Sequence, residues 1–101
     1  SLDKEIQTKP FINENRLHGR GACDTKGSIA AMLMALIEMS KMSDRPKSTE
    51  IIFAALVDEE NKQLGSRAAV DHIGKVDLAI IGEPTSCRGI TAHKGNFWHK
   101  I

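Results

Sequence analysis

The sequence has little of several features that would assign it to a class directly. Its 101 residues include no tyrosine, only 4% aromatic residues and two cysteines, Cys23 and Cys87, whose spacing is not that of a metal-binding pair. No apolar run approaches the roughly 20 residues that a membrane helix needs. The formal net charge is +1, so no broad field of one sign attracts nucleic acid. These absences predict one cytoplasmic domain at most, with reduced thiols and with neither a nucleic-acid nor a membrane partner.

Two stretches have the apolar spacing of helices. From Ile29 onwards, apolar residues recur at i, i+3, i+4, i+7 and i+8, which predicts a helix over Gly27–Met42. A second helix is expected over Gln63–Ile73, closed by Gly74. The earlier stretch around Asn13 has the polar composition of a turn.

Two other stretches are typical of buried strands. Glu50–Val57 contains an apolar run rich in β-branched residues, without the polar alternation of a sheet that has one wet face. Asp77–Gly82 is a shorter run of the same kind. With a helix between them they form a βαβ unit, which makes the two strands parallel. The expected fold class is α/β, with parallel central strands flanked by helices.

Carboxylates occupy the positions where these strands should end. Asp58, Glu59 and Glu60 follow the first strand, Glu83 follows the second, and Asp24 lies in a glycine-rich loop before the first helix. Ligands bind at the carboxyl edge of a parallel sheet, so the three loops can converge there. Clustered acids repel one another, and a divalent cation would neutralise them.

Each acid also has a plainer interpretation. The D-E-E-N string is also typical of a solvated turn or of the first turn of a helix, Asp24 could cap the first helix, and Glu83 could be a loop residue before proline. The four histidines follow no metal-binding pattern. On carboxylates alone Mg²⁺ or Mn²⁺ would be favoured, because zinc prefers imidazole or thiolate ligands.

Four ordered strings resemble one known family. They are G-R-G-A-C-D-T-K-G over Gly19–Gly27, D-E-E over Asp58–Glu60, I-G-E-P-T over Ile81–Thr85 and A-H-K-G over Ala92–Gly95. Together they resemble the co-catalytic zinc amidohydrolase and metallopeptidase family, which includes acetylornithine deacetylase, succinyl-diaminopimelate desuccinylase, aminoacylase and carboxypeptidase G-like enzymes. The similarity runs from about Pro10 to Ile101.

The resemblance implies a role for each carboxylate. Asp24 would bridge two Zn²⁺ ions, for which Co²⁺ or Mn²⁺ could substitute, while Glu60 would bind one ion and Glu83 the other. Glu59 would be the catalytic general base on the metal-activated water. The peptide bond after the bridging aspartate, here Asp24–Thr25, is expected to be cis. His93 matches the entry to the lid domain of the family and is not expected to bind metal.

The resemblance also implies a domain organisation. Residues 1–87 would form part of a zinc-exopeptidase-like catalytic domain, and residues 88–101 would begin the lid or dimerisation domain, with extended runs at Arg88–His93 and Phe97–Ile101. The histidine ligands of the family come from regions upstream and downstream of these 101 residues. The isolated segment is therefore expected to be inactive and to bind zinc poorly, and the full-length protein to be a homodimer.

The expected activity is hydrolysis of the amide bond of an N-acyl amino acid or short peptide. The E-P-T-S and A-H-K-G strings are closest to acetylornithine deacetylase, which would place the protein in arginine biosynthesis. A desuccinylase or dipeptidase of the same family is the alternative. A non-catalytic homologue that serves as a binding or assembly module is an alternative of another class, although Glu59 beside Glu60 favours catalysis.

Overall fold

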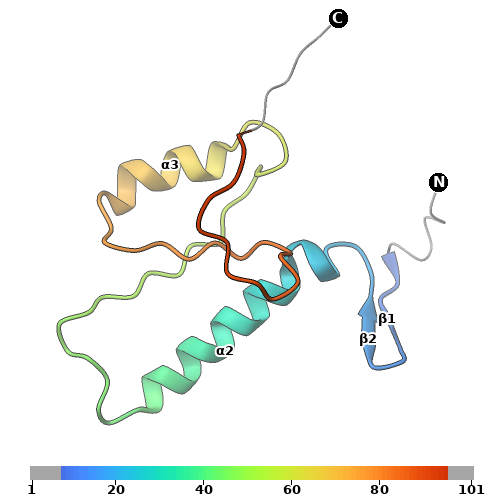
Figure 1. Cartoon of the computed structure of the whole chain (residues 1–101), viewed down its shortest axis with the longest axis horizontal. Coiled ribbons are helices and arrows are strands. Elements are labelled where there is room, and N and C mark those ends of the chain that lie inside the picture. Colours follow the sequence, from blue (N-terminus) through green and yellow to red (C-terminus); the bar gives the residue numbers. More distant parts are fainter. Residues whose placement is uncertain (1–7, 96–101) are drawn as a thin grey trace, which may run out of the picture.

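A computed structural model describes residues 8–95 of the chain, and these residues form two helices, one short π-helical turn and a small hairpin (Figure 1). In chain order the elements are β1 (Phe11–Asn13), β2 (Arg16–His18), η1 (Ala22–Lys26), α2 (Gly27–Lys41) and α3 (Leu64–Ile73). No helix in the described part of the chain is long and apolar enough to cross a membrane.

The hairpin lies beyond the N-terminal end of α2, away from α3 (Figure 1). Strands β1 and β2 pair antiparallel, with Phe11 opposite His18. Glu14 and Asn15 connect them with φ values of 47° and 59°, as a tight two-residue hairpin turn requires. The turn was expected from the sequence, but the three-residue strands on either side were not.

Helix α2 confirms the first helix prediction and ends one residue before the expected boundary. Ile29, Met32, Leu36 and Met39 are half-buried along it, at the three- and four-residue spacing of one helix face. On the exposed face, Lys41 forms an ion pair of 2.9 Å with Glu38.

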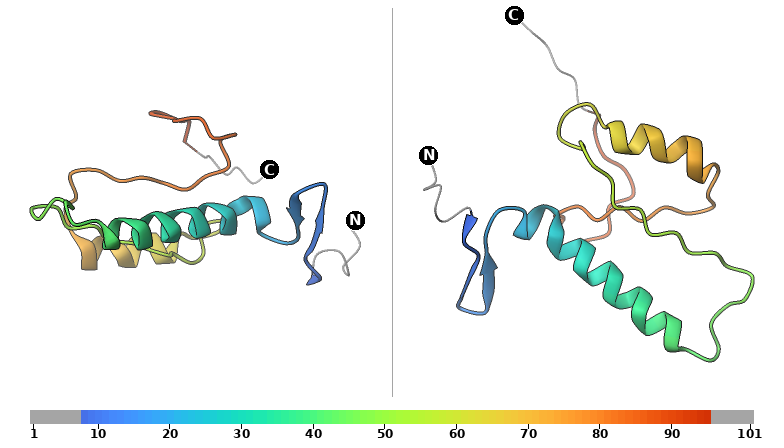
Figure 2. Two further views of the ribbon diagram at one scale, coloured as in Figure 1. Left: turned by 90° about the horizontal axis from the view of Figure 1, so that it is seen from below. Right: turned by 180° about the vertical axis from the view of Figure 1, so that it is seen from behind.

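Helix α3 confirms the second helix prediction. It begins at Leu64 and ends before Gly74, which has a φ of 72°. A residue with a side chain adopts that backbone conformation only at a cost, so glycine is a natural stop signal. Gly65, Ala69 and Ile73 are half-buried on one face. In Figure 2 (left), α3 lies on one side of α2, and the chain that follows it lies on the other side.

The expected central strands require a correction. Residues 50–57 and 77–82 are not strands, and the described residues contain only the one antiparallel pair. The physical reason is that an apolar, β-branched run reports a tendency to be buried, whereas a strand also needs a partner for its backbone groups. The arrangement is that of a partial α/β domain, and the parallel pairing is not confirmed.

One of the two extended runs expected near the end of the chain can be compared with the structure. Arg88–His93 was expected to be extended and forms no strand, while Phe97–Ile101 lies outside the described residues. The division into a catalytic part and a lid part after residue 87 stays a prediction.

The described residues contain no buried core. No side chain between residues 8 and 95 is buried, and Leu78, Ile80 and Val57 are 79%, 78% and 71% exposed. The radius of gyration is 17.0 Å, against about 13 Å for a compact domain of this length. The apolar faces of the two helices and of the extended segments therefore have little to pack against within these residues.

The lack of a core predicts how the isolated 101-residue chain melts. A domain of this length normally unfolds with an enthalpy of about 60–80 kcal/mol, most of which depends on packed interior contacts. We expect scanning calorimetry of the isolated chain to show no cooperative transition of that size, whereas the product of the complete open reading frame should show one. A sharp endotherm of the isolated chain within that range would contradict the prediction.

Candidate metal and catalytic site

The first of the three acid-bearing loops is η1, which connects the hairpin to α2. Its backbone closes through hydrogen bonds from Lys26 N to Gly21 O (2.9 Å) and from Gly27 N to Ala22 O. Asp24 has non-helical backbone angles inside this turn, and the Asp24–Thr25 peptide bond is cis, which confirms the expectation. The residue at the N-cap position of α2 is Lys26, with no side-chain cap. Asp24 is therefore not the cap of this helix, and its exposed carboxylate is available to bind a ligand.

The second loop joins residues 51–57 to α3, and Asp58 organises it. The Asp58 carboxylate accepts hydrogen bonds from the backbone N–H groups of Lys62 (3.2 Å) and Leu64 (3.3 Å), and its own carbonyl accepts one from Gln63 (2.7 Å). Of these donors, the Leu64 N–H belongs to the first turn of α3, where the helix itself leaves it unpaired, and the other two belong to the loop before it. The plainer interpretation of the D-E-E-N string is therefore correct for Asp58, which holds the start of α3.

The end of this loop is fixed by Gly65 in the first turn of α3. Its N–H donates to the carbonyl of Val57 at 3.2 Å. A Cβ at position 65 would lie 2.5 Å from Val57 N and 2.6 Å from Val57 O, too close for any side chain. Glycine thus allows the helix to approach the backbone just before Asp58, and the approach closes the loop that carries Glu59 and Glu60.

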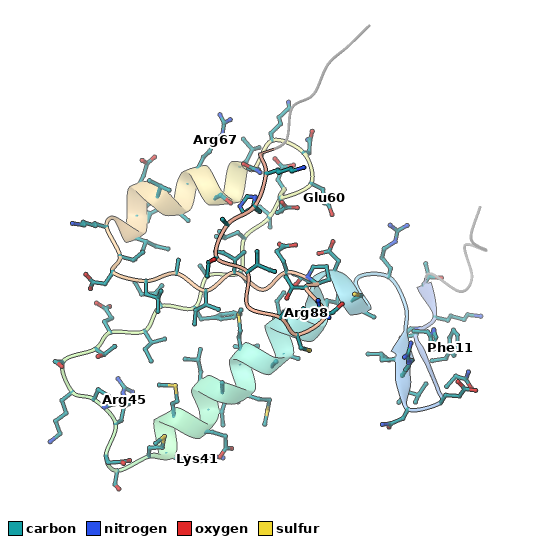
Figure 3. All side chains as sticks on the ribbon, viewed as in Figure 1. Phe11, Lys41, Arg45, Glu60, Arg67 and Arg88 are labelled. Carbon is teal, nitrogen blue, oxygen red and sulfur yellow. The ribbon has the colours of Figure 1, made fainter. Side chains whose placement is uncertain are left out.

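Glu59 and Glu60 have a different environment from Asp58. Both side chains are exposed, and neither makes a hydrogen bond or an ion pair in the described part of the chain. They line a hollow of about 460 Å³ together with Lys62 and with Arg67 of α3. Figure 3 shows Glu60 on the loop that leads into α3 and Arg67 on the helix itself. Sequence reasoning missed the two cationic residues, because no motif marks them.

The third loop follows residues 77–82 and begins with Glu83. It turns through a hydrogen bond of 2.9 Å from Thr85 N to Glu83 O and a second of 2.7 Å from the Thr85 hydroxyl to Arg88 O. The Glu83 side chain is exposed and has no hydrogen-bond partner within residues 8–95. In this respect its carboxylate resembles those of Glu59 and Glu60, none of which holds the surrounding backbone through a hydrogen bond within residues 8–95.

Two observations bring the three loops together. The Thr25 hydroxyl of the first loop donates a hydrogen bond to the Gly82 carbonyl at the start of the third. Partial desolvation raises the pKa of the exposed Glu59 carboxyl, and the negative charges of Glu60, Glu83 and Asp24 raise this pKa further. Asp24, Glu60 and Glu83 are thus close enough to Glu59 for their charges to affect its pKa.

The carboxylates do not form a closed metal cluster. Among residues 8–95 no three acidic, histidine or cysteine side chains are placed to hold one ion. The assignment of Asp24, Glu60 and Glu83 as ligands and of Glu59 as base accordingly stays a prediction.

Three of the four histidines lie within the described residues, in separate parts of the chain. His18 stacks on Phe11 in the hairpin with ring centroids 4.7 Å apart, and His72 lies in the last turn of α3. The Nδ1 of His93 lies 2.9 Å from the carbonyl oxygen of its neighbour Lys94. His99 is outside the described residues.

Comparison with known proteins identifies the class to which this combination of loops belongs. The model of peptidase family M20/M25/M40 matches residues 2–94, and the chain belongs to that family. This confirms the resemblance inferred from the four sequence strings.

Individual relatives agree with the family assignment. The chain is 35% identical over 89 residues to a peptidase M20 domain-containing protein of Schizosaccharomyces pombe. The aligned segment covers 86% of the chain and 22% of the relative. It is 36% identical over 90 residues to a probable succinyl-diaminopimelate desuccinylase of Staphylococcus aureus, and this alignment covers 87% of the chain and 22% of the relative. The corresponding protein of Staphylococcus epidermidis is 40% identical over 85 residues, covering 82% and 21%.

The chain thus spans about a fifth of the length of these curated relatives, 21–22% in each case. No solved structure matches it.

The role of Asp58 as an organiser of the second loop can be tested by substitution. Asp58→Ala removes the acceptor for two backbone N–H groups, and loss of such a cap costs about 0.5–2 kcal/mol. In the product of the complete open reading frame we expect this loss in the free energy of unfolding, with faster amide exchange at Lys62 and Leu64. Asp44→Ala, at an exposed acid in the loop after α2, is the matched control. Unchanged amide exchange in Asp58→Ala would show that the cap has no energetic role.

Proposed function

We propose that the protein carrying this chain is a metal-dependent hydrolase that cleaves the amide bond of an N-acyl amino acid. One observation carries the proposal: in a chain of family M20/M25/M40, Glu59 lies near enough to Glu60, Glu83 and Asp24, which come from three loops, for their negative charges to raise its pKa. Membership of the family supports a hydrolase, and the uncommitted carboxylates supply the groups that such a reaction needs.

The donor set suits a pair of divalent cations. Asp24, Glu60 and Glu83 are exposed, come from three separate loops and offer only oxygen ligands, so they would hold the metal ions. In the proposed arrangement Asp24 would be shared by two Zn²⁺ ions, Glu60 would hold one and Glu83 the other, and Co²⁺ or Mn²⁺ could substitute. When bound, such ions polarise the amide carbonyl and make water a better nucleophile.

Glu59 is the proposed general base. It lies next to a proposed ligand, Glu60, yet its carboxylate has no hydrogen-bond or ion-pair partner in the described residues. A carboxylate free of such partners can accept a proton from the attacking water and later deliver it to the leaving amine. The products are a carboxylate and a free amine.

The role of Glu59 is tested by Glu59→Gln in the complete protein. The amide side chain keeps the shape and removes the base, so kcat should fall by about 10²–10⁴-fold while the metal content stays at the wild-type level. Turnover and metal analysis of the same preparation measure both. Glu38→Gln is the control, because Glu38 is an exposed acid on α2 whose one ion-pair partner within residues 8–95 is Lys41. Loss of metal with a mild loss of rate would mean that Glu59 is a ligand.

The acyl group separates two candidate substrates. The E-P-T-S and A-H-K-G strings favour N-acetylornithine, and with it a role in arginine biosynthesis. The names of the staphylococcal relatives favour N-succinyl-diaminopimelate as a second candidate. Both are N-acyl amino acids and require the same cleavage, so the proposed reaction is common to them.

A comparison of these substrates tests the proposal at two levels. We expect the complete protein with zinc to hydrolyse at least one of the two, and the ratio of the kcat/KM values identifies the acyl group. A tenfold ratio corresponds to about 1.4 kcal/mol of differential transition-state binding. Zinc binding without turnover of N-acetyl, N-succinyl or dipeptide substrates would instead support a non-catalytic binding module.

A further inference from the structure

The contact between the first and third loops involves residues that no motif argument assigns. Thr25 follows Asp24, and Gly82 precedes Glu83, so each partner of the Thr25–Gly82 hydrogen bond is the immediate neighbour of a proposed metal ligand. The two residues are 57 positions apart in the chain, and both are half-buried. This hydrogen bond therefore joins the backbones that carry the two carboxylates.

Packing at Gly82 strengthens the same contact. A Cβ built at position 82 would lie 2.8 Å from Ser28 Cβ and 2.9 Å from Met32 Cε, both on α2. The Ser28 Cβ is fixed by the helix backbone, so a rotation of the side chain cannot relieve this contact. Only glycine allows the third loop to approach the start of α2 this closely, and the approach is what brings the Gly82 carbonyl within reach of Thr25.

We propose that Thr25 and Gly82 are positioning residues that set the placement of Glu83 relative to Asp24. The Thr25–Gly82 contact fixes one backbone against the other, and the close approach at Gly82 keeps the third loop on α2. This inference rests on the proposed function, because its consequence is the spacing of two metal ligands. Neither residue touches substrate or metal in this proposal.

The hydroxyl of Thr25 is tested with a pair of variants in the complete protein. Thr25→Val keeps the β-branched shape and removes the donor, whereas Thr25→Ser keeps the donor. Partners that orient metal ligands typically change metal affinity by about 10–100-fold. Calorimetric titration of the metal-free protein with Zn²⁺ should show one of two sites weakened by about that factor in Thr25→Val and restored in Thr25→Ser.

The close approach at Gly82 is tested with a second pair. Gly82→Ala introduces a methyl group that must displace the third loop, so it should weaken the same zinc site as Thr25→Val. Gly89→Ala is the matched control, because a Cβ at position 89 meets nothing within 4 Å. Its zinc titration should equal that of the wild type.

The outcomes distinguish this proposal from the proposed function. Wild-type zinc affinity in both Thr25→Val and Gly82→Ala would overturn the positioning role while leaving the hydrolase proposal intact. Equal weakening in Thr25→Val and Thr25→Ser would also overturn it, because the hydroxyl would then be irrelevant. A wild-type protein that binds no zinc would refute the proposed function. Amide exchange at Thr85, whose N–H donates to the Glu83 carbonyl, would then test the contact itself in the metal-free protein, since Thr25→Val should speed that exchange if the hydrogen bond positions the loop.

Discussion

The hydrogen bond from Thr25 to the Gly82 carbonyl is the contact on which the arrangement of the candidate site depends. The described residues have no buried core that could hold the loops in place from below. The position of each carboxylate must then come from local contacts: a turn closed onto itself in η1, a capped loop before α3, and the close approach of Gly82 to α2. Of these, only the contacts of Gly82 connect one acid-bearing loop with another. They therefore decide how the first and third loops are placed relative to each other.

Glycine has the same physical role at two places in this arrangement. At Gly65 the helix α3 meets the backbone of Val57, and at Gly82 the extended chain meets Ser28 and Met32 of α2. In both cases a Cβ would lie below 3 Å from an atom that cannot easily move. Gly65 approaches the residue before Asp58, and Gly82 is itself the residue before Glu83. The two close approaches therefore help to set the backbone positions from which these acidic side chains extend.

The sequence predicted the elements that depend on a local residue pattern. It did not predict contacts that depend on a segment distant in the chain. Helical spacing gave α2 and α3 to within a residue, and the resemblance of the Gly19–Gly27 string correctly implied the cis peptide bond at Asp24. Residues 50–57 have the composition of a central strand, but strand formation needs a neighbouring backbone, and composition carries no information about that neighbour. Thr25 and Gly82 were missed as a pair for the same reason. Their contact spans 57 residues and has no periodicity from which to infer it.

The three consecutive acids Asp58, Glu59 and Glu60 differ in role because their side chains have different neighbours. Asp58 has a positive φ of 64°, and its short side chain accepts hydrogen bonds from the backbone N–H groups of Lys62, in the loop before α3, and of Leu64, the first residue of α3. Aspartate tolerates this left-handed conformation better than most residues, and its carboxylate is then used up as a cap. Glu59 and Glu60 carry longer side chains on the outer part of the same loop, where no backbone donor in the described residues binds them. Because Asp58 accepts the hydrogen bonds from the backbone N–H groups of Lys62 and Leu64, the two glutamates are not needed for them. A loop with three equivalent acids thus becomes one structural residue followed by two whose carboxylates are available for chemistry.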